Sequence, residues 1–272
     1  MTRIAVQQLA PVLGDLDRNR ALALAAIREA LEAGADVVVL PELITSGYVF
    51  SSPDEAAEAA IGADHELLRE WAEEARRADA VVVGGFCERG DDGRLYNSAA
   101  LVDAAGLRAV YRKLHLWDHE KLLFAPGTAP PPVLETRVGR VGVLICYDLE
   151  FPELTRWAAL AGAQLLAVPT NWPLVPRPDG ERPPEALIAM AAARVNRMAI
   201  ACADRLGTER GVEWTGGATI VGVDGWVAAE RRDTGLLVAD VDLAEALEKR
   251  LTEHADAFGD RRPDIYAALA RD

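Results

Sequence analysis

Short apolar runs alternate with segments of helical periodicity along the first third of the chain. Apolar runs predict strands, and apolar residues recurring every three or four positions predict helices. Strands are predicted over 3–9, 36–40 and 80–88, and helices over 17–33 and 64–79. Gly34 suits the position after a helix C-terminus. A further helix is predicted after Ser52, because Pro53 and two acidic residues follow it.

The pattern changes near residue 94, where hairpins replace the strand–helix alternation. Residues 94–103 and 107–113 predict one hairpin, and 132–148 predicts another that turns near Gly139. Alternation then resumes, with helices predicted over 151–163, 183–197 and 242–252 and strands over 164–170, 198–205, 216–230 and 235–242. This order predicts an α/β layered fold with two mixed sheets and helices outside them.

Two proline-rich stretches, 125–132 and 173–184, resemble linkers at first sight. Both lie between strongly patterned segments, with no shift in composition on either side. We therefore interpret them as ordered loops and expect residues 1–272 to form a single domain.

Charge narrows the range of partners. The 272 residues carry 29 basic and 43 acidic side chains, for a formal net charge of −14. Such a chain would repel a phosphate backbone or an anionic membrane surface, so neither nucleic acid nor membrane is expected as a partner. No uninterrupted apolar stretch approaches the length of a membrane span.

The cysteine content and the N-terminus predict the compartment. Cys87, Cys146 and Cys202 cannot all pair within one chain, which indicates a reducing cytoplasm. The N-terminal segment does not resemble a secretory signal, because Gln7 and Gln8 interrupt its short apolar stretch. We therefore expect a cytoplasmic protein.

Three chemically useful side chains each follow a predicted strand. Glu42 comes directly after 36–40, Lys113 ends 107–113, and Cys146 ends the apolar run VGVLI. Strand ends are where sites form in α/β folds, so the three side chains could share one cleft. A cysteine at a strand-to-helix turn also lies near backbone N–H groups that favour a thiolate and can bind an oxyanion.

Each of these residues also has an ordinary structural interpretation. Cys146 could be a small buried hydrophobe, Glu42 a solvated loop residue, and Lys113 part of a basic surface pair with Arg112. His115 and His119, four residues apart with Glu120 beside them, could hold a metal, although the segment is a poor helix. A Cys146–His dyad is another alternative.

Three motifs resemble the nitrilase superfamily of carbon–nitrogen hydrolases: VVLPELITSGY, YRKLHL with EKLLFAPG, and GVLICYDLEFPEL. The resemblance extends from RIAVQQL to DRRPDIY. It implies a four-layer α-β-β-α sandwich with two mixed sheets and a catalytic triad of Glu42, Lys113 and Cys146. It also implies a second glutamate, best matched by Glu120 and less well by Asp118. The fold is usually dimeric, which predicts an interface at the helix after Cys146 and the tail 253–272.

The implied chemistry assigns a role to each residue. Cys146 attacks the substrate as a thiolate, and Glu42 acts as general base. Lys113 and the backbone N–H of Tyr147 stabilise the oxyanion, while Glu120 orients Lys113 or the substrate nitrogen. No metal or organic cofactor is required. The acyl pocket is expected near four further residues, of which the two tryptophans could instead be packing residues: Tyr48, Trp117, Asn171 and Trp172.

The motif around the cysteine indicates the substrate class. CYDLEFPEL resembles amidase-type members rather than true nitrilases, and AVPTNWP with ACADR resembles bacterial amidases of small aliphatic or amino-acid-derived amides. We therefore predict hydrolysis of a small carboxamide to acid and ammonia through a thioester. The alternatives are hydrolysis of nitriles or N-carbamoyl groups on the same triad, and a non-catalytic binding protein of the same fold.

Overall fold

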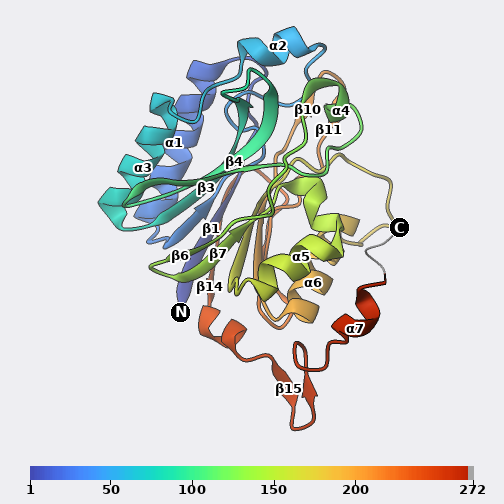
Figure 1. The fold of residues 1–272 in the computed structure, drawn as a ribbon. Helices are drawn as coiled ribbons and strands as arrows, with labels where there is room; N and C mark the ends of the chain where they lie inside the picture. The colour runs from blue at the N-terminus through green and yellow to red at the C-terminus, as the bar shows by residue number, and fades with distance from the viewer. Residues whose placement is uncertain (269–272) are drawn as a thin grey trace.

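The computed structural model describes residues 1–268, which form two six-stranded sheets packed face to face (Figure 1). The first sheet has the order β14-β1-β2-β3-β4-β5 and the second β13-β12-β9-β8-β7-β6. In Figure 1, α1 and α3 cover the outer side of the first sheet, and α5 and α6 that of the second. The predicted α-β-β-α sandwich is therefore confirmed.

The elements of the sheets follow the apolar runs of the sequence. The strands of the first sheet are β1 (Thr2–Gln8), β2 (Val37–Val39), β3 (Val81–Arg89), β4 (Leu95–Asp103), β5 (Gly106–Arg112) and β14 (Gly235–Val241). Those of the second are β6 (Val133–Thr136), β7 (Gly139–Val143), β8 (Leu165–Pro169), β9 (Ala199–Ala203), β12 (Thr219–Val221) and β13 (Val227–Glu230). Two short hairpins lie apart from the sheets: β10 (Thr208–Glu209) with β11 (Val212–Glu213), and β15 (Arg250–Thr252) with β16 (Ala255–Asp256).

The helices are amphipathic covers or short loop elements. The α-helices are α1 (Leu16–Glu32), α2 (Pro53–Glu58), α3 (Glu66–Ala78), α4 (Glu120–Leu123), α5 (Pro152–Leu160), α6 (Pro184–Asn196) and α7 (Pro263–Tyr266). Two 3-10 helices are η1 (Cys146–Glu150) and η2 (Leu243–Leu247). Ser52 caps α2 as predicted, accepting the backbone N–H of Glu55.

Parallel strands at the centre of each sheet set the location of the site. β1, β2 and β3 run parallel in one sheet, and β7, β8 and β9 run parallel in the other. β2, β8 and β9 are wholly buried, as expected for strands covered on both faces. The carboxyl ends of parallel strands meet at one edge, so segments that follow β2, β7 and β8 can converge there.

One predicted helix is wrong. The segment 242–252 forms only the short helix η2 and then β15. Leu243 and Ala246 are buried, but Leu247 is 69% exposed and Leu251 44% exposed, so a longer helix would have no apolar face to bury. The predicted interface tail 253–272 contains β16 and α7, and its last four residues lie outside the described ones. No helix of residues 1–268 is long and apolar enough to cross a membrane.

Gly85 allows β3 to approach the turn after β2. A Cβ at Gly85 would lie 2.4 Å from the backbone N of Leu43 and 2.6 Å from the Cα of Glu42. A Cβ at Gly142, on β7, would meet side-chain atoms no nearer than 3.2 Å. Neither glycine has a positive φ, so the two positions differ mainly in how closely the neighbouring chain packs against them.

Gly85→Ala should therefore lower the free energy of unfolding by about 1–3 kcal/mol, because the backbone that it meets cannot move aside without strain. Gly142→Ala, the matched control, should change it by no more than about 1 kcal/mol in either direction. Urea denaturation of both variants measures the difference. Equal changes in the free energy of unfolding would show that the close approach of β3 to the turn after β2 does not require a glycine at position 85.

Candidate active site

Cys146 is the first residue of η1, at the sharp turn that follows β7. Its φ is +45°, in the left-handed region that few residues with side chains adopt. The cysteine is 7% exposed, and burial raises the pKa of its thiol overall, although the backbone of Asn171 lowers that pKa. Such a strained turn fixes where the sulfur points, which is typical of functional positions.

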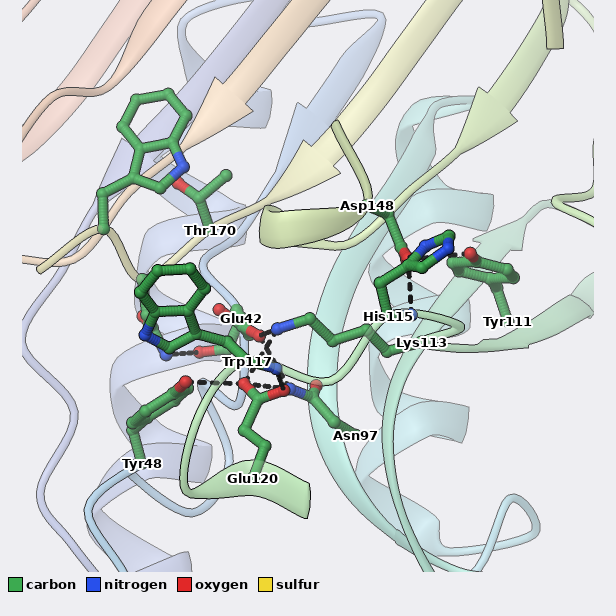
Figure 2. A network of polar contacts seen from close by, with 12 residues as sticks. Glu42, Tyr48, Asn97, Tyr111, Lys113, His115, Trp117, Glu120, Asp148 and Thr170 are labelled. Carbon is green, nitrogen blue, oxygen red and sulfur yellow. Dashed lines mark hydrogen bonds and ion pairs between the residues drawn. The ribbon is translucent and has the colours of Figure 1, made fainter. Parts of the chain in front are cut away.

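Lys113 is fully buried, and its ammonium lies between two carboxylates (Figure 2). Its Nζ lies 2.7 Å from Glu42 Oε1 and 2.8 Å from Glu120 Oε1. Glu42 is fully buried and Glu120 is 2% exposed, so all three charged groups are removed from water. The sequence predictions for Glu42, Lys113 and Glu120 thus converge on one cluster.

Asn97, on β4, is a second donor to the same two oxygens. Its Nδ2 lies 2.7 Å from Glu42 Oε1 and 3.2 Å from Glu120 Oε1 (Figure 2). The sequence pattern did not identify Asn97 as a site residue. The available signal was an amide side chain in the middle of the otherwise largely apolar strand LYNSAALV.

The two carboxylates differ in how their oxygens are used. Glu120 Oε1 also accepts the Tyr48 hydroxyl at 2.6 Å, and its Oε2 accepts the backbone N–H of Trp117 at 2.9 Å. Glu42 Oε2 is buried and has no hydrogen-bond partner among the described residues. Glu120 is therefore held on both oxygens, whereas Glu42 keeps one oxygen available for a proton.

Burial and neighbouring charge set the proton affinities. Burial raises the pKa of Glu42 to about 7, because Lys113 lowers it only partly and Glu120 opposes that effect. Burial alone would lower the pKa of Lys113, but Glu120 and Glu42 together hold it well above its usual value. Burial also raises the pKa of the Cys146 thiol, as does the charge of Glu42. The thiol therefore needs a base close by to ionise.

Asp148 ties the cysteine turn to the segment after β5. Its Oδ2 accepts the Tyr111 hydroxyl at 2.8 Å, and its Oδ1 accepts the backbone N–H of His115 at 2.9 Å (Figure 2). The His115 ring contacts the same carboxylate through Nδ1 at 2.9 Å and stacks on Phe151. Asp148 is fully buried and was missed by sequence analysis, although it follows Cys146 by two residues.

The sequence left two alternatives for the histidines: a metal site at His115 and His119, and a catalytic dyad of Cys146 with one of them. His115 contacts Asp148, while His119 is exposed. The charged groups that shift the pKa of the Cys146 thiol are Glu42, Lys113 and Glu120, and neither histidine is among them. Within residues 1–268, no group of three or more His, Cys, Asp or Glu side chains is placed to hold a metal ion.

The segment after β8 closes another side of the site. Asn171 is buried, and its Nδ2 donates to the backbone carbonyl of Glu42 at 3.0 Å.

The backbone N–H groups of Trp172 and Gly217 donate to Asp204 at 2.9 and 2.7 Å. Burial raises the pKa of Asp204 to about 6. Trp172 is 2% exposed and packs in the core.

A pocket of about 470 Å³ opens next to Glu120. Of the five residues predicted to bind the substrate, Tyr48 and Trp117 line this pocket, whereas Tyr147, Asn171 and Trp172 are not among its lining residues. Tyr147 is half-buried and lies with its ring edge-on to Trp117 at 4.7 Å between centroids. Tyr48 and Trp117 thus connect the pocket to the Glu120 carboxylate.

Comparisons with known proteins agree with this arrangement. The family model for carbon–nitrogen hydrolases matches residues 3–250. A nitrilase from Pyrococcus abyssi is 35% identical, over 98% of this chain and 99% of that protein. An N-carbamoylputrescine amidase from Arabidopsis thaliana is 32% identical, over 94% of this chain and 91% of that protein.

A solved structure gives the same fold. The amidase from Nesterenkonia sp. AN1 superposes with a TM-score of 0.80 at 30% identity, covering 99% of this chain and 100% of that one. That structure is a glutamate-to-glutamine mutant in which acrylamide has added to the active-site cysteine. Family model, relatives and structure agree, so the chain belongs to the carbon–nitrogen hydrolase family of the nitrilase superfamily and is an enzyme acting on non-peptide C–N bonds.

Proposed function

We propose that this enzyme hydrolyses a carboxamide to a carboxylic acid and ammonia through a thioester on Cys146. The observation that carries the proposal is the buried Glu42–Lys113–Glu120 cluster around Cys146, in which one Glu42 oxygen has no partner among the described residues. A thiol, a base and a fixed positive charge are the groups that amide hydrolysis by covalent catalysis needs.

Acylation begins when Glu42 Oε2 takes the Cys146 thiol proton and the sulfur attacks the amide carbonyl carbon. The carbonyl oxygen becomes an oxyanion, which the Lys113 ammonium and the backbone N–H of Tyr147 stabilise. The C–N bond then breaks, and the proton held by Glu42 passes to the departing nitrogen, releasing ammonia. A pKa of about 7 lets Glu42 accept and return a proton near neutral pH.

Deacylation uses the same groups with water in place of the thiol. Glu42 removes a proton from water, which attacks the thioester carbonyl carbon, and Lys113 again stabilises the oxyanion. The C–S bond breaks, and the sulfur recovers a proton from Glu42. Glu120 is the positioning residue in both steps, because its oxygens accept from Lys113, Tyr48 and Trp117.

The sequence around Cys146 and the likeness to the Nesterenkonia amidase favour a carboxamide over a nitrile or an N-carbamoyl compound. Ammonia release from matched carboxamides, nitriles and N-carbamoyl compounds should therefore be fastest with the carboxamides. Cys146→Ala should lower this rate by roughly 10⁴-fold or more, because no acyl-enzyme can form.

Cys202→Ala is the control for this experiment, because Cys202 is also a buried free cysteine and lies on β9. It should retain activity. Faster turnover of the nitrile, or release of carbon dioxide together with ammonia from the carbamoyl compound as the favoured reaction, would replace the proposal with that alternative. Undiminished turnover by Cys146→Ala would reject the nucleophile.

The face formed by α5, α6 and the described part of the tail carries exposed apolar side chains. Trp157 is 50% exposed, Val195 53% and Ile265 58%. Exposed apolar residues gathered on one face are typical of an interface between subunits. Together with the family resemblance, this supports a homodimer formed through that face.

Light scattering should therefore give a mass of about twice the 29.3 kDa of the chain. Trp157→Glu combined with Ile265→Glu should shift the protein toward the monomer, because buried charges without partners destabilise an interface. The matched control is Leu107→Glu, at an apolar residue that is 39% exposed on β5 of the other sheet. A wild-type monomer with full activity would contradict the dimer.

A further inference from the structure

The pocket beside Glu120 has two walls from distant parts of the chain. One wall contains Tyr48 from the loop after β2, together with Val212 and Trp214 from β11 and the residue after it. The other is the segment Trp117–Glu120 with Leu123. At the inner end, the Tyr48 hydroxyl donates to Glu120 Oε1, the oxygen that also accepts from Lys113. The pocket therefore adjoins the catalytic cluster.

The walls of the pocket are mostly apolar or aromatic. Five aliphatic or aromatic residues accompany the rings of Tyr48, Trp117 and Trp214: Val49, Phe50, Leu123, Pro173 and Val212. The remaining lining residues are Glu120 at the inner end and the exposed Asp118 and His119. Each Glu120 oxygen already accepts hydrogen bonds from the protein. The charged group deep in this pocket is thus already paired with Lys113, which favours an uncharged substrate chain.

Hydrogen bonds hold the first wall in place. The carboxylate of Glu209 accepts the backbone N–H of Tyr48 at 2.8 Å and the Arg205 guanidinium at 3.0 Å. The backbone N–H of Leu174 donates to the carbonyl of Glu213 at 2.8 Å. The Tyr48 and Trp214 rings meet edge to face at 5.1 Å between centroids. A wall fixed in this way binds a ligand with little loss of conformational entropy.

We propose that this pocket takes the acyl group of the substrate and selects carboxamides whose acyl group is large and apolar, above all arylalkyl amides. This inference rests on the proposed amidase function and adds the class of carboxamide that the enzyme prefers. A volume of about 470 Å³ is typical of pockets for ligands much larger than acetamide. A phenyl ring packed against Trp117, Trp214 and Val212 would bury apolar surface that acetamide is too small to reach.

Val212 and Glu213 provide a matched pair for testing the pocket. Val212 is half-buried and lines it, whereas Glu213 is exposed and does not. Neighbouring side chains on a strand point to opposite sides, so tryptophan fills the pocket at position 212 and faces away from it at position 213. Both substitutions add the same side chain to the same hairpin.

The measurement is the ratio of kcat/KM for 3-phenylpropanamide to that for acetamide. Wild type should favour 3-phenylpropanamide by at least about tenfold. Val212→Trp should lower this ratio by at least about tenfold, while Glu213→Trp leaves it unchanged. A wild-type preference for acetamide, or equal ratios in the two variants, would overturn the proposal.

Calorimetry with Cys146→Ala separates failure of this proposal from failure of the amidase function. This variant cannot form the acyl-enzyme, so it reports binding alone. Tighter binding of 3-phenylpropanamide than of acetamide supports the pocket assignment even where wild type hydrolyses no carboxamide, and only the amidase function then fails. Hydrolysis of carboxamides with equal or weaker binding of 3-phenylpropanamide rejects the pocket assignment and leaves the amidase function standing.

Discussion

The buried ammonium group of Lys113 is the interaction on which the site depends. It holds the carboxylates of Glu42 and Glu120 within 2.7 and 2.8 Å, in a region closed to water. Two buried carboxylates without such a partner would destabilise the fold by several kcal/mol. Asn97 adds a neutral donor to the same two oxygens, which offsets part of the negative charge that one lysine cannot balance.

Sharing one cation between two carboxylates has a chemical consequence. Lys113 lowers the pKa of Glu42, but burial and the charge of Glu120 together outweigh it and leave that pKa at about 7. A glutamate paired with a lysine of its own would be a weaker base. In this chain the second carboxylate thus has two effects: it accepts a hydrogen bond from Lys113, and its charge raises the pKa of Glu42.

The fold was largely predictable because its physical causes are local. Buried central strands appear as apolar runs, and the ends of three strands or hairpins carry Glu42, Lys113 and Cys146. The predicted helix over 242–252 failed because its later apolar residues have nothing to pack against, which depends on tertiary structure. The positive φ of Cys146 likewise depends on the turn that Asp148 ties to β5.

Asn97 shows why part of the site could not be predicted. Its position within a strand pattern identifies β4 but not the face or neighbour that its side chain meets. That contact depends on the register of β4 against β3 and on the close approach at Gly85 of β3 to the Glu42 turn. Trp172 shows a second limit, because the sequence left open whether it lies near the acyl pocket or packs, and only the structure shows that it is 2% exposed within the core.

The distinct roles of the two glutamates are tested most directly by intact-protein mass spectrometry after incubation with a carboxamide substrate. Glu120→Gln keeps the size of the positioning residue and should still acylate, giving a mass increase equal to the acyl group on Cys146. Glu42→Gln lacks the base that removes the thiol proton, so no acyl group should appear. Normal acylation of Glu42→Gln, with none in a folded Glu120→Gln, would contradict the account and reverse the two roles.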